Sequence, residues 1–256
     1  MAYTRKSERK RFIVLKMIGK AKKALKEGGI SLLIRRSANF FYRKISPVLP
    51  YRYSKYNNVK VPSHRAFGKI VPLINTEDKP EYEKGIIESL KKNVREEDKV
   101  VICGGGLGVT AVKSAELNKK PENVEVFEGS ESQIEKIEET FQENNIEGIR
   151  IHHSIVGEEK NIWGEKGAAN TTQPSELPSC DILEMDIEGS EMKVLEELDI
   201  EPRIIIVESH GNLGSPTEEV KKILTEKNYE IKNVDLAEET DHAKENDIKV
   251  ITGEKA

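Results

Sequence analysis

The chain has 256 residues, of which 36% are hydrophobic and 34% charged, with a formal net charge of -4 at pH 7; this length holds one sizeable α/β domain and an appendage but not two full domains. No apolar run approaches the ~20 residues that span a bilayer, and the basic N-terminus lacks the continuous apolar core of a signal peptide, so we expect a cytoplasmic protein. Its two cysteines, Cys103 and Cys180, lie in apolar strand patterns, which predicts buried free thiols and excludes a disulfide framework or a metal-type cysteine motif.

Positive charge is concentrated at the start of the chain, where residues 1–60 contain 17 Lys or Arg and 2 Glu, against 24 basic and 43 acidic residues in the remainder. Stretches 5–27 and 31–45 place apolar residues at helical spacing among Lys and Arg, which predicts two basic amphipathic helices. We expect residues 1–57 to form a basic helical appendage that contacts the inner face of a membrane or a membrane-bound partner. Packing on the rest of the chain or on a second subunit is the alternative. Tyrosines also alternate with basic residues here, but no nucleic-acid-binding module accompanies them, so we expect no nucleic-acid partner.

Residues 58–79 contain prolines and turn-forming residues, which predict a linker. An Asp-x-x-Glu start at Asp78 then predicts a helix that ends near Asn93. From residue 80 to residue 256 strand and helix patterns alternate, which predicts a single α/β domain.

A short β-branched run, Val100–Ile102, ends abruptly in Gly104, Gly106 and Gly108 and leads into a helical pattern from Val109. Such a run is typical of a strand buried on both faces of a parallel sheet, and the glycines let the backbone bend tightly and approach a ligand. Free N–H groups at the start of the next helix would face that ligand; an ordinary tight turn is the alternative. Because Val109 stands where the dinucleotide motif G-x-G-x-x-G needs its third glycine, a dehydrogenase is disfavoured.

The next predicted strand ends in Glu128, a carboxylate in register to accept both ribose hydroxyls of a nucleoside; a solvated strand end is the alternative. A polar loop at 157–179 contains the sole tryptophan, Trp163, which could cover a substrate or anchor the loop. Ser215-Pro216-Thr217-Glu218 predicts a capping box that opens a helix. The remaining strands are expected near 149–152, 180–185, 203–207, 229–234 and 248–251.

Polar residues follow two of these strands directly. Asp186 to Glu191 come after strand 180–185, and Glu208 to His210 come at the end of strand 203–207. In a strand-helix alternation, ligand chemistry collects at the carboxyl ends of the strands. We therefore expect these residues to share one cleft with the glycine turn and Glu128.

These motifs resemble those of FkbM-like methyltransferases, and the stretch from Tyr82 to Gly211 is most similar to archaeal members. The matching segments, in order, are Ile102-Cys-Gly-Gly-Gly-Leu-Gly108, Val126-Phe-Glu128, His153-Ser-Ile-Val-Gly157, Leu183-Glu-Met-Asp-Ile-Glu-Gly-Ser-Glu191 and Ile206-Val-Glu-Ser-His210. The resemblance implies a Rossmann-like class I methyltransferase fold over residues 80–256, with a mostly parallel seven-stranded sheet and a C-terminal antiparallel hairpin. It also implies S-adenosylmethionine as cofactor and O-methylation of a hydroxyl or carboxyl on a sugar, glycan or similar metabolite.

The same resemblance implies a set of cofactor-binding residues within these motifs. They are Gly104, Gly105, Gly106, Gly108, Glu128, Gly129, Ser130, Ser154 and Ile155. One position departs from the family: its first motif usually opens with Asp, which helps to place the methionine end of the cofactor, and this chain has Ile102 there. We expect a substitute carboxylate from the preceding helix, either Glu81 or Glu83.

Methyl transfer to a hydroxyl requires that the proton of that hydroxyl be removed. The candidate catalytic residues are Asp186, Glu188, Glu208 and His210. His210 is the expected general base, because its ordinary pKa of about 6.5 suits neutral conditions. The carboxylates could instead hold a divalent cation that lowers the acceptor's pKa; no metal ligand is assigned. A third alternative is that Asp186 and Glu188 only cap the next helix.

A non-catalytic nucleotide-fold protein that binds a partner through its basic arm is the competing hypothesis for the whole chain. The apolar residue at position 102 would permit such a protein. Binding of the cofactor without turnover would distinguish it from an enzyme.

Overall fold

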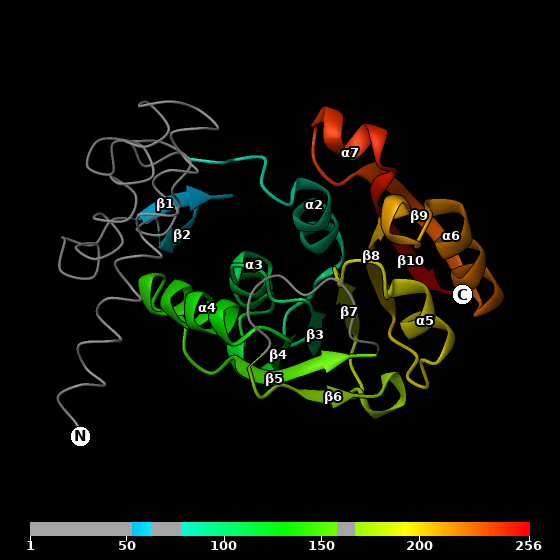
Figure 1. Ribbon diagram of the computed structural model, residues 1–256. Helices are drawn as coiled ribbons and strands as arrows, with labels where there is room; N and C mark the ends of the chain where they lie inside the picture. Colours follow the sequence, from blue (N-terminus) through cyan, green and yellow to red (C-terminus); the bar gives the residue numbers. More distant parts are fainter. Residues whose placement is uncertain (1–52, 63–77, 158–166) are drawn as a thin grey trace, which may run out of the picture. The chain divides into compact units, whose positions relative to one another are not determined.

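The computed structural model describes residues 53–62, 78–157 and 167–256 (Figure 1). The two predicted basic helices, most of the predicted linker and Trp163 lie outside the described residues. Within the described ranges, no helix is long and apolar enough to cross a membrane.

Among the described residues, the main sheet has eight strands in the order β6-β5-β4-β3-β7-β8-β10-β9. The strands from β6 to β8 run parallel, whereas β10 is antiparallel to both β8 and β9. The prediction of a mostly parallel sheet with a C-terminal antiparallel hairpin is confirmed. The strands are β3 (Val100–Cys103), β4 (Val124–Glu128), β5 (Arg150–Val156), β6 (Asn170–Thr172), β7 (Ile182–Met185), β8 (Ile204–His210), β9 (Tyr229–Leu236) and β10 (Ile248–Lys255).

The eighth strand, β6, is an addition to the seven that were predicted. It lies within the predicted loop 157–179 and pairs parallel with Ser154–Val156 of β5. Its residues are polar and two of them are exposed, so no apolar alternation marks it in the sequence. The Ser154 and Thr172 hydroxyls lie 2.6 Å apart and join the edge strand to β5.

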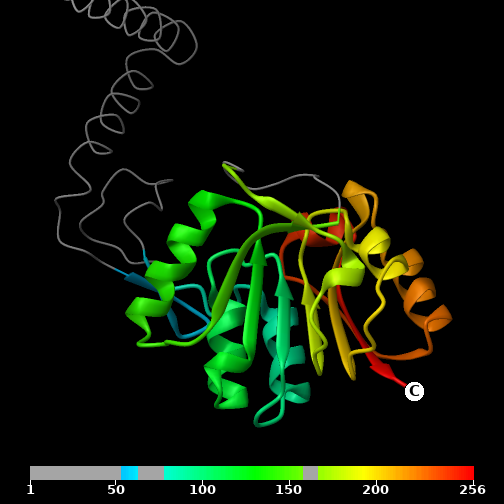
Figure 2. The same ribbon diagram turned by 90° about the horizontal axis from the view of Figure 1, so that it is seen from below.

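Helices cover both faces of the sheet (Figure 2). Alternate residues of β3 supply two cores: Val100 and Ile102 pack with α2, α3 and α4, whereas Val101 and Cys103 pack with α5 and α6. Burial on both faces explains the unbroken apolar run of β3. The helices are α2 (Lys84–Asn93), α3 (Val109–Asn118), α4 (Glu131–Glu143), α5 (Glu191–Glu196), α6 (Thr217–Glu226) and α7 (Asp241–Glu245).

Helix α2 begins later than the sequence predicted. It starts at Lys84, because Glu83 has a left-handed backbone conformation (φ 49°) that interrupts the helical run. Asp78, the predicted first cap, instead accepts a hydrogen bond of 2.9 Å from the backbone N–H of Lys55. Residues 80–83 therefore form a turn after a bridge between Lys79 and Tyr56, and this segment reaches the site described below.

A two-stranded antiparallel sheet of β1 (Tyr53–Tyr56) and β2 (Val59–Pro62) precedes α2. The predicted boundary between the appendage and the linker, at 57/58, falls in the turn of this hairpin. Asn144 at the end of α4 donates to the carbonyl of Lys60 (2.8 Å) and accepts from its N–H (3.0 Å). The hairpin thus belongs to the same unit as residues 76–256.

Candidate active site

A cavity of about 680 Å³ opens at the carboxyl ends of β3, β4, β5, β7 and β8. This is the edge of the sheet at which the sequence placed the ligand chemistry. The predicted site residues that line it are Glu83, Gly104, Gly106, Glu128, Gly129, Ser154, Ile155, Asp186, Glu188 and Glu208. Four other predicted residues, Gly105, Gly108, Ser130 and His210, are not part of the lining.

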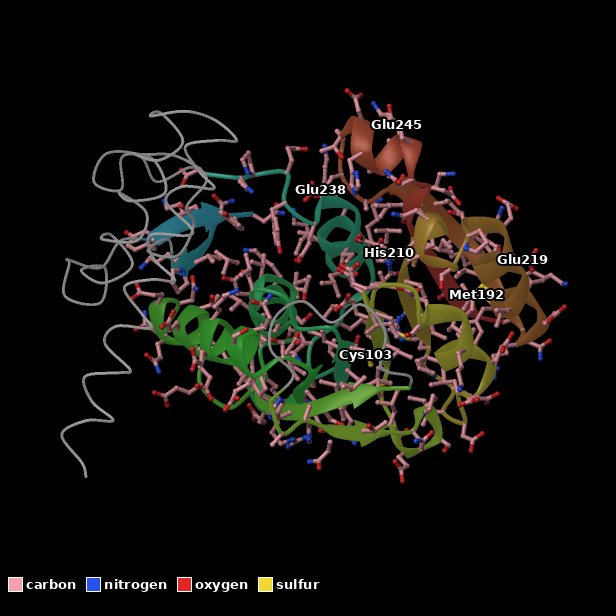
Figure 3. All side chains as sticks on the ribbon, viewed as in Figure 1. Cys103, Met192, His210, Glu219, Glu238 and Glu245 are labelled. Carbon is pink, nitrogen blue, oxygen red and sulfur yellow. The ribbon has the colours of Figure 1, made fainter. Side chains whose placement is uncertain are left out.

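Several lining residues were not predicted. Lys79 and Tyr82 come from the turn before α2, and Gln133 and Lys136 come from α4. Glu238 and His242 come from the segment between β9 and β10, and Figure 3 shows Glu238 beside α2. Their positions depend on tertiary contacts, and no local motif marks them in the sequence.

The glycine turn packs tightly against its neighbours. Gly104 has φ 95°, and a Cβ atom there would lie 1.9 Å from the backbone oxygen of Asp186. A Cβ on Gly105 would lie 2.5 Å from the Cδ1 atom of Ile137 in α4. Gly106 (φ 50°) is different, because a Cβ there would meet only Glu83 and Tyr82 at 3.5 Å or more. The first two glycines are therefore required by packing, and the third leaves open space at the cavity.

Glu128 is held in a fixed orientation at the end of β4. Its Oε2 accepts a hydrogen bond from the backbone N–H of Gly105 (3.0 Å), and its Oε1 accepts one from the N–H of Ser130 (2.8 Å). The side chain is buried, and burial raises its pKa, although these backbone hydrogen bonds oppose the shift. Glu128 also lines the cavity, so its carboxylate faces a ligand bound there.

The structure distinguishes between the two substitute carboxylates that were considered for Ile102. Glu81 is 59% exposed and pairs with Lys84 at 2.6 Å, so it faces solvent. Glu83 lines the cavity, and its Oε2 is buried without a hydrogen-bond partner among the described residues. Burial, followed by the nearby charge of Asp186, raises the pKa of Glu83 to about 8.

A further buried carboxyl, which the sequence analysis did not select, lies directly beside Ile102. Glu184 of β7 pairs with Ile102 of β3 in the parallel register and is fully buried. Burial and the charge of Asp186 raise its pKa well above the ordinary value. Burial therefore favours the protonated form of Glu184, which is not part of the cavity lining.

His210, the last residue of β8, is surrounded by carboxylates. Its Nδ1 atom lies 2.9 Å from Oε1 of Glu191, and its Nε2 atom lies 3.6 Å from both Asp186 Oδ1 and Glu208 Oε1. Burial lowers the pKa of His210, but the Glu191 hydrogen bond and the charge of Asp186 outweigh this effect and raise it to about 9. The ring is consequently protonated at neutral pH.

The two carboxyls that face His210 respond to the same surroundings. Burial raises the pKa of Asp186 to about 7, and the positive charge of His210 opposes this shift. Burial and then the charge of Asp186 raise the pKa of Glu208 well above its ordinary value. Asp186 can therefore exchange a proton near neutral pH, whereas burial favours the protonated form of Glu208.

Glu191 is a functional candidate that the sequence analysis missed, although it ends one of the quoted motifs. Its side chain is 0% exposed, and its Oε1 also accepts a hydrogen bond of 3.0 Å from the N–H of Gly189. A glutamate in the first turn of a helix is ordinarily interpreted as a solvated cap, which concealed its role. Asp186 makes no hydrogen bond to the first turn of α5, so it does not cap that helix.

Comparison with known proteins decides the family. A family model described as Methyltransferase FkbM domain matches residues 70–231. The chain belongs to the FkbM methyltransferase family. The segment that the family model matches contains the glycine turn, Glu128 and the His210 cluster. The chain is a methyltransferase, and S-adenosylmethionine is its cofactor. The non-catalytic alternative is therefore set aside.

Solved structures show the same methyltransferase fold at low sequence identity. A ribosomal protein L11 methylase from Lactobacillus delbrueckii subsp. bulgaricus is 13% identical, with a TM-score of 0.50 over 70% of this chain and 81% of that one. A tRNA m1G37 methyltransferase from M. jannaschii is 14% identical, with a TM-score of 0.51 over 80% of this chain and 54% of that one. No curated protein matches the FkbM chain in a sequence search.

Proposed function

We propose that this FkbM methyltransferase O-methylates a hydroxyl or carboxyl group of a sugar, glycan or similar metabolite. The observation that carries the proposal is the position of Asp186 and Glu208. These carboxylates line the same cavity as the glycine turn and Glu128, so one cavity offers both a nucleoside site and groups that accept a proton.

The residues around the cavity fit S-adenosylmethionine. Glu128 would bind the ribose hydroxyls, Ser154, Ile155 and Gly129 would lie along the same half of the cofactor, and Glu83 would bind its charged methionine end. The buried, unpartnered Oε2 of Glu83 is the observation that supports this fit. When bound, the cofactor supplies an electrophilic methyl group, and the chain's task is to align the acceptor and remove its proton.

We assign the removal of that proton to Glu208 or Asp186. This revises the expectation that His210 is itself the general base. His210 is not part of the cavity lining, and its pKa of about 9 leaves the ring charged at neutral pH. In the metal-free protein, an imidazolium 3.6 Å from Asp186 opposes the rise in the pKa of that carboxyl and so favours its carboxylate form, which is the form that accepts a proton.

The charge of the cavity favours an uncharged acceptor group over an anionic one. Six acidic side chains line it against two lysines, Lys79 and Lys136; an anionic acceptor would be repelled by the ionised carboxylates and would raise the pKa of the protonated ones further. A hydroxyl is accordingly a better acceptor here than an ionised carboxylate. We also propose a cytoplasmic location with contact to the inner membrane face through residues 1–57, supported by their charge.

The test is a transfer assay of the purified full chain with S-adenosylmethionine and paired acceptors. Neutral sugars and their uronic acid counterparts differ only in one carboxylate, and mass analysis detects the added methyl group. Methylation of a neutral sugar or glycan hydroxyl supports the proposal. Transfer confined to nitrogen or carbon atoms of the acceptor contradicts it.

A further inference from the structure

Three side chains at the ends of β7 and β8 form a compact set of possible metal ligands. Asp186 and Glu188 follow β7, His210 ends β8, and each offers a ligand atom within 4.8 Å of the others. Two of the three, Asp186 and Glu188, also line the cavity. An ion bound to this set would therefore be in reach of an acceptor in the cavity.

The His210 ring shows a feature that a cluster of surface acids lacks. Its side chain is 6% exposed, and its Nε2 atom makes no hydrogen bond among the described residues. The nearest atoms to Nε2, Asp186 Oδ1 and Glu208 Oε1, are both 3.6 Å away, which is too long for a hydrogen bond. Asp186 Oδ1 is itself buried without a hydrogen-bond partner. Asp186 Oδ1 is therefore a buried acceptor that faces the imidazole without a hydrogen bond, and a buried polar atom left in this way costs stability unless something binds it.

The spacing of these atoms suits a shared ion. Nitrogen and oxygen ligands lie about 2.0 to 2.2 Å from a small divalent cation, so two ligands of one ion lie roughly 3 to 4 Å apart. The separation of 3.6 Å between Nε2 and Asp186 Oδ1 falls within this range.

The other ring nitrogen of His210 is oriented as it is in known metal sites. A metal-binding histidine ordinarily donates its second N–H to a carboxylate, which fixes the ring and its tautomer. Here Nδ1 donates to Glu191 at 2.9 Å, and Glu191 is itself fixed by the N–H of Gly189 at 3.0 Å. Nε2 is then left as the atom that points toward Asp186.

We propose that Asp186, Glu188 and His210 bind one divalent cation at the acceptor end of the cavity. Carboxylate oxygens favour Mg²⁺ and Mn²⁺, whereas an imidazole nitrogen favours softer ions; Mn²⁺ fits the mixed set best. The binding itself stands apart from the proposed function. A role for the ion in lowering the pKa of an acceptor hydroxyl, with Glu208 accepting the proton, rests on that function.

The test is calorimetric titration of MnCl₂ into the full chain after removal of metal with a chelator. We expect one Mn²⁺ per chain, and we expect Asp186→Asn and His210→Gln each to weaken its binding at least tenfold. Glu191→Gln should weaken it by about 10- to 100-fold, because it loosens the ring without removing a ligand. Glu238→Gln is the matched control, since Glu238 lines the same cavity but is outside the ligand set, and its Mn²⁺ affinity should match that of the wild type.

Circular dichroism and thermal melting establish that each variant is folded, and the wild-type titration is decisive without them. A folded wild-type chain that binds no Mn²⁺, Mg²⁺ or Zn²⁺ at millimolar concentration overturns the proposal. Equal losses of Mn²⁺ affinity in Asp186→Asn and Glu238→Gln also overturn it, because they indicate general electrostatic attraction. Specific Mn²⁺ binding by a chain that methylates no sugar hydroxyl would instead refute the proposed acceptor and leave the metal site supported.

Discussion

Glu83 combines a left-handed backbone with a buried carboxyl at the cavity wall. Its pKa rises from 4.5 in the unfolded chain to about 8 in the folded protein, so the folded state prefers the protonated form. The contribution of Glu83 to the free energy of unfolding is fully present below pH 4.5 and is lost as the pH rises through about 8.

We therefore expect the free energy of unfolding of the cofactor-free and metal-free chain to fall between pH 5 and pH 9. Glu83→Gln, which resembles the protonated form at every pH, should reduce this fall. Urea denaturation across that range measures it, with the exposed Glu81→Gln as control. An unchanged pH dependence in Glu83→Gln would show that Glu83 is not the titrating group.

Glu128 leads to a prediction about affinity for the cofactor. Glu128→Ala should weaken S-adenosylmethionine binding by about 1 to 3 kcal/mol, because hydrogen bonds to a charged group are lost. Calorimetric titration measures the change, and Glu122→Ala, an exposed glutamate just before β4, should bind the cofactor like the wild type. Wild-type affinity in a folded Glu128→Ala chain would remove Glu128 from the cofactor site.

At the scale of single residues, the sequence predicted the cavity residues that directly follow strands. It missed the cavity residues that only tertiary packing brings there. Glu128, Asp186 and Glu208 could be placed because a parallel sheet brings its strand ends together. Glu238 could not be placed, because it reaches the cavity only through the β9–β10 segment. Glu191 was passed over because a first-turn glutamate has an ordinary explanation.

At the scale of elements, α6 begins at Thr217, one residue after the predicted start, and is capped by a different residue. A capping box on Ser215 was expected, and the structure instead places Asp247, just before β10, at the first turn. Its Oδ2 accepts from the N–H of Thr217 and its Oδ1 from the Thr217 hydroxyl, each at 3.0 Å. Because the capping residue is 30 positions away in the sequence, no pattern near the start of α6 predicts it.

Asp247→Ala should consequently lower the free energy of unfolding by about 1 kcal/mol, the usual effect of removing a helix cap. Asp241→Ala, an exposed aspartate in the first turn of α7, should lower it by less than half as much. Chemical denaturation of both variants at pH 7 gives the comparison. Equal effects would show that Asp247 acts only through its charge.

The elements that were predicted correctly are those with a strong apolar pattern. The strands β3 and β7 are buried throughout, and burial on both faces favours apolar residues; Glu184 of β7 is the exception. The turn before α2 was not predicted, because no change of residue type marks it in the sequence. Only the left-handed backbone of Glu83 delays the start of the helix to Lys84. The polar strand β6 escaped it because edge strands need little apolar surface.

At the scale of the whole molecule, the hairpin β1–β2 changes where the basic segment can be removed. A chain without residues 1–52 keeps the hairpin and its contacts with Asn144. We expect it to fold and to bind the cofactor, and to lose salt-sensitive binding to anionic vesicles in a sedimentation assay.

A chain without residues 1–62 is the matched comparison, because it lacks the hairpin as well. We expect it to melt at a lower temperature than the chain without residues 1–52, since the apolar contacts of β2 with the core are lost. Vesicle binding that survives removal of residues 1–52 would contradict the membrane proposal. An unfolded product of that shorter deletion would show that residues 1–52 are needed for the fold.

The segment between β9 and β10 has a consequence for how such enzymes diversify. It contributes Glu238 and His242 to the cavity, while its ends are fixed by the Gly85 N–H on the carbonyl of Ala237 and by Asp247 on Thr217. The glycine turn and Glu128 belong to other strands entirely. Changes at residues 239–246 would therefore alter this side of the cavity without replacing the glycine turn or Glu128, whereas Glu238 accepts a hydrogen bond of 3.4 Å from the N–H of Glu83 and so reaches the proposed donor site as well.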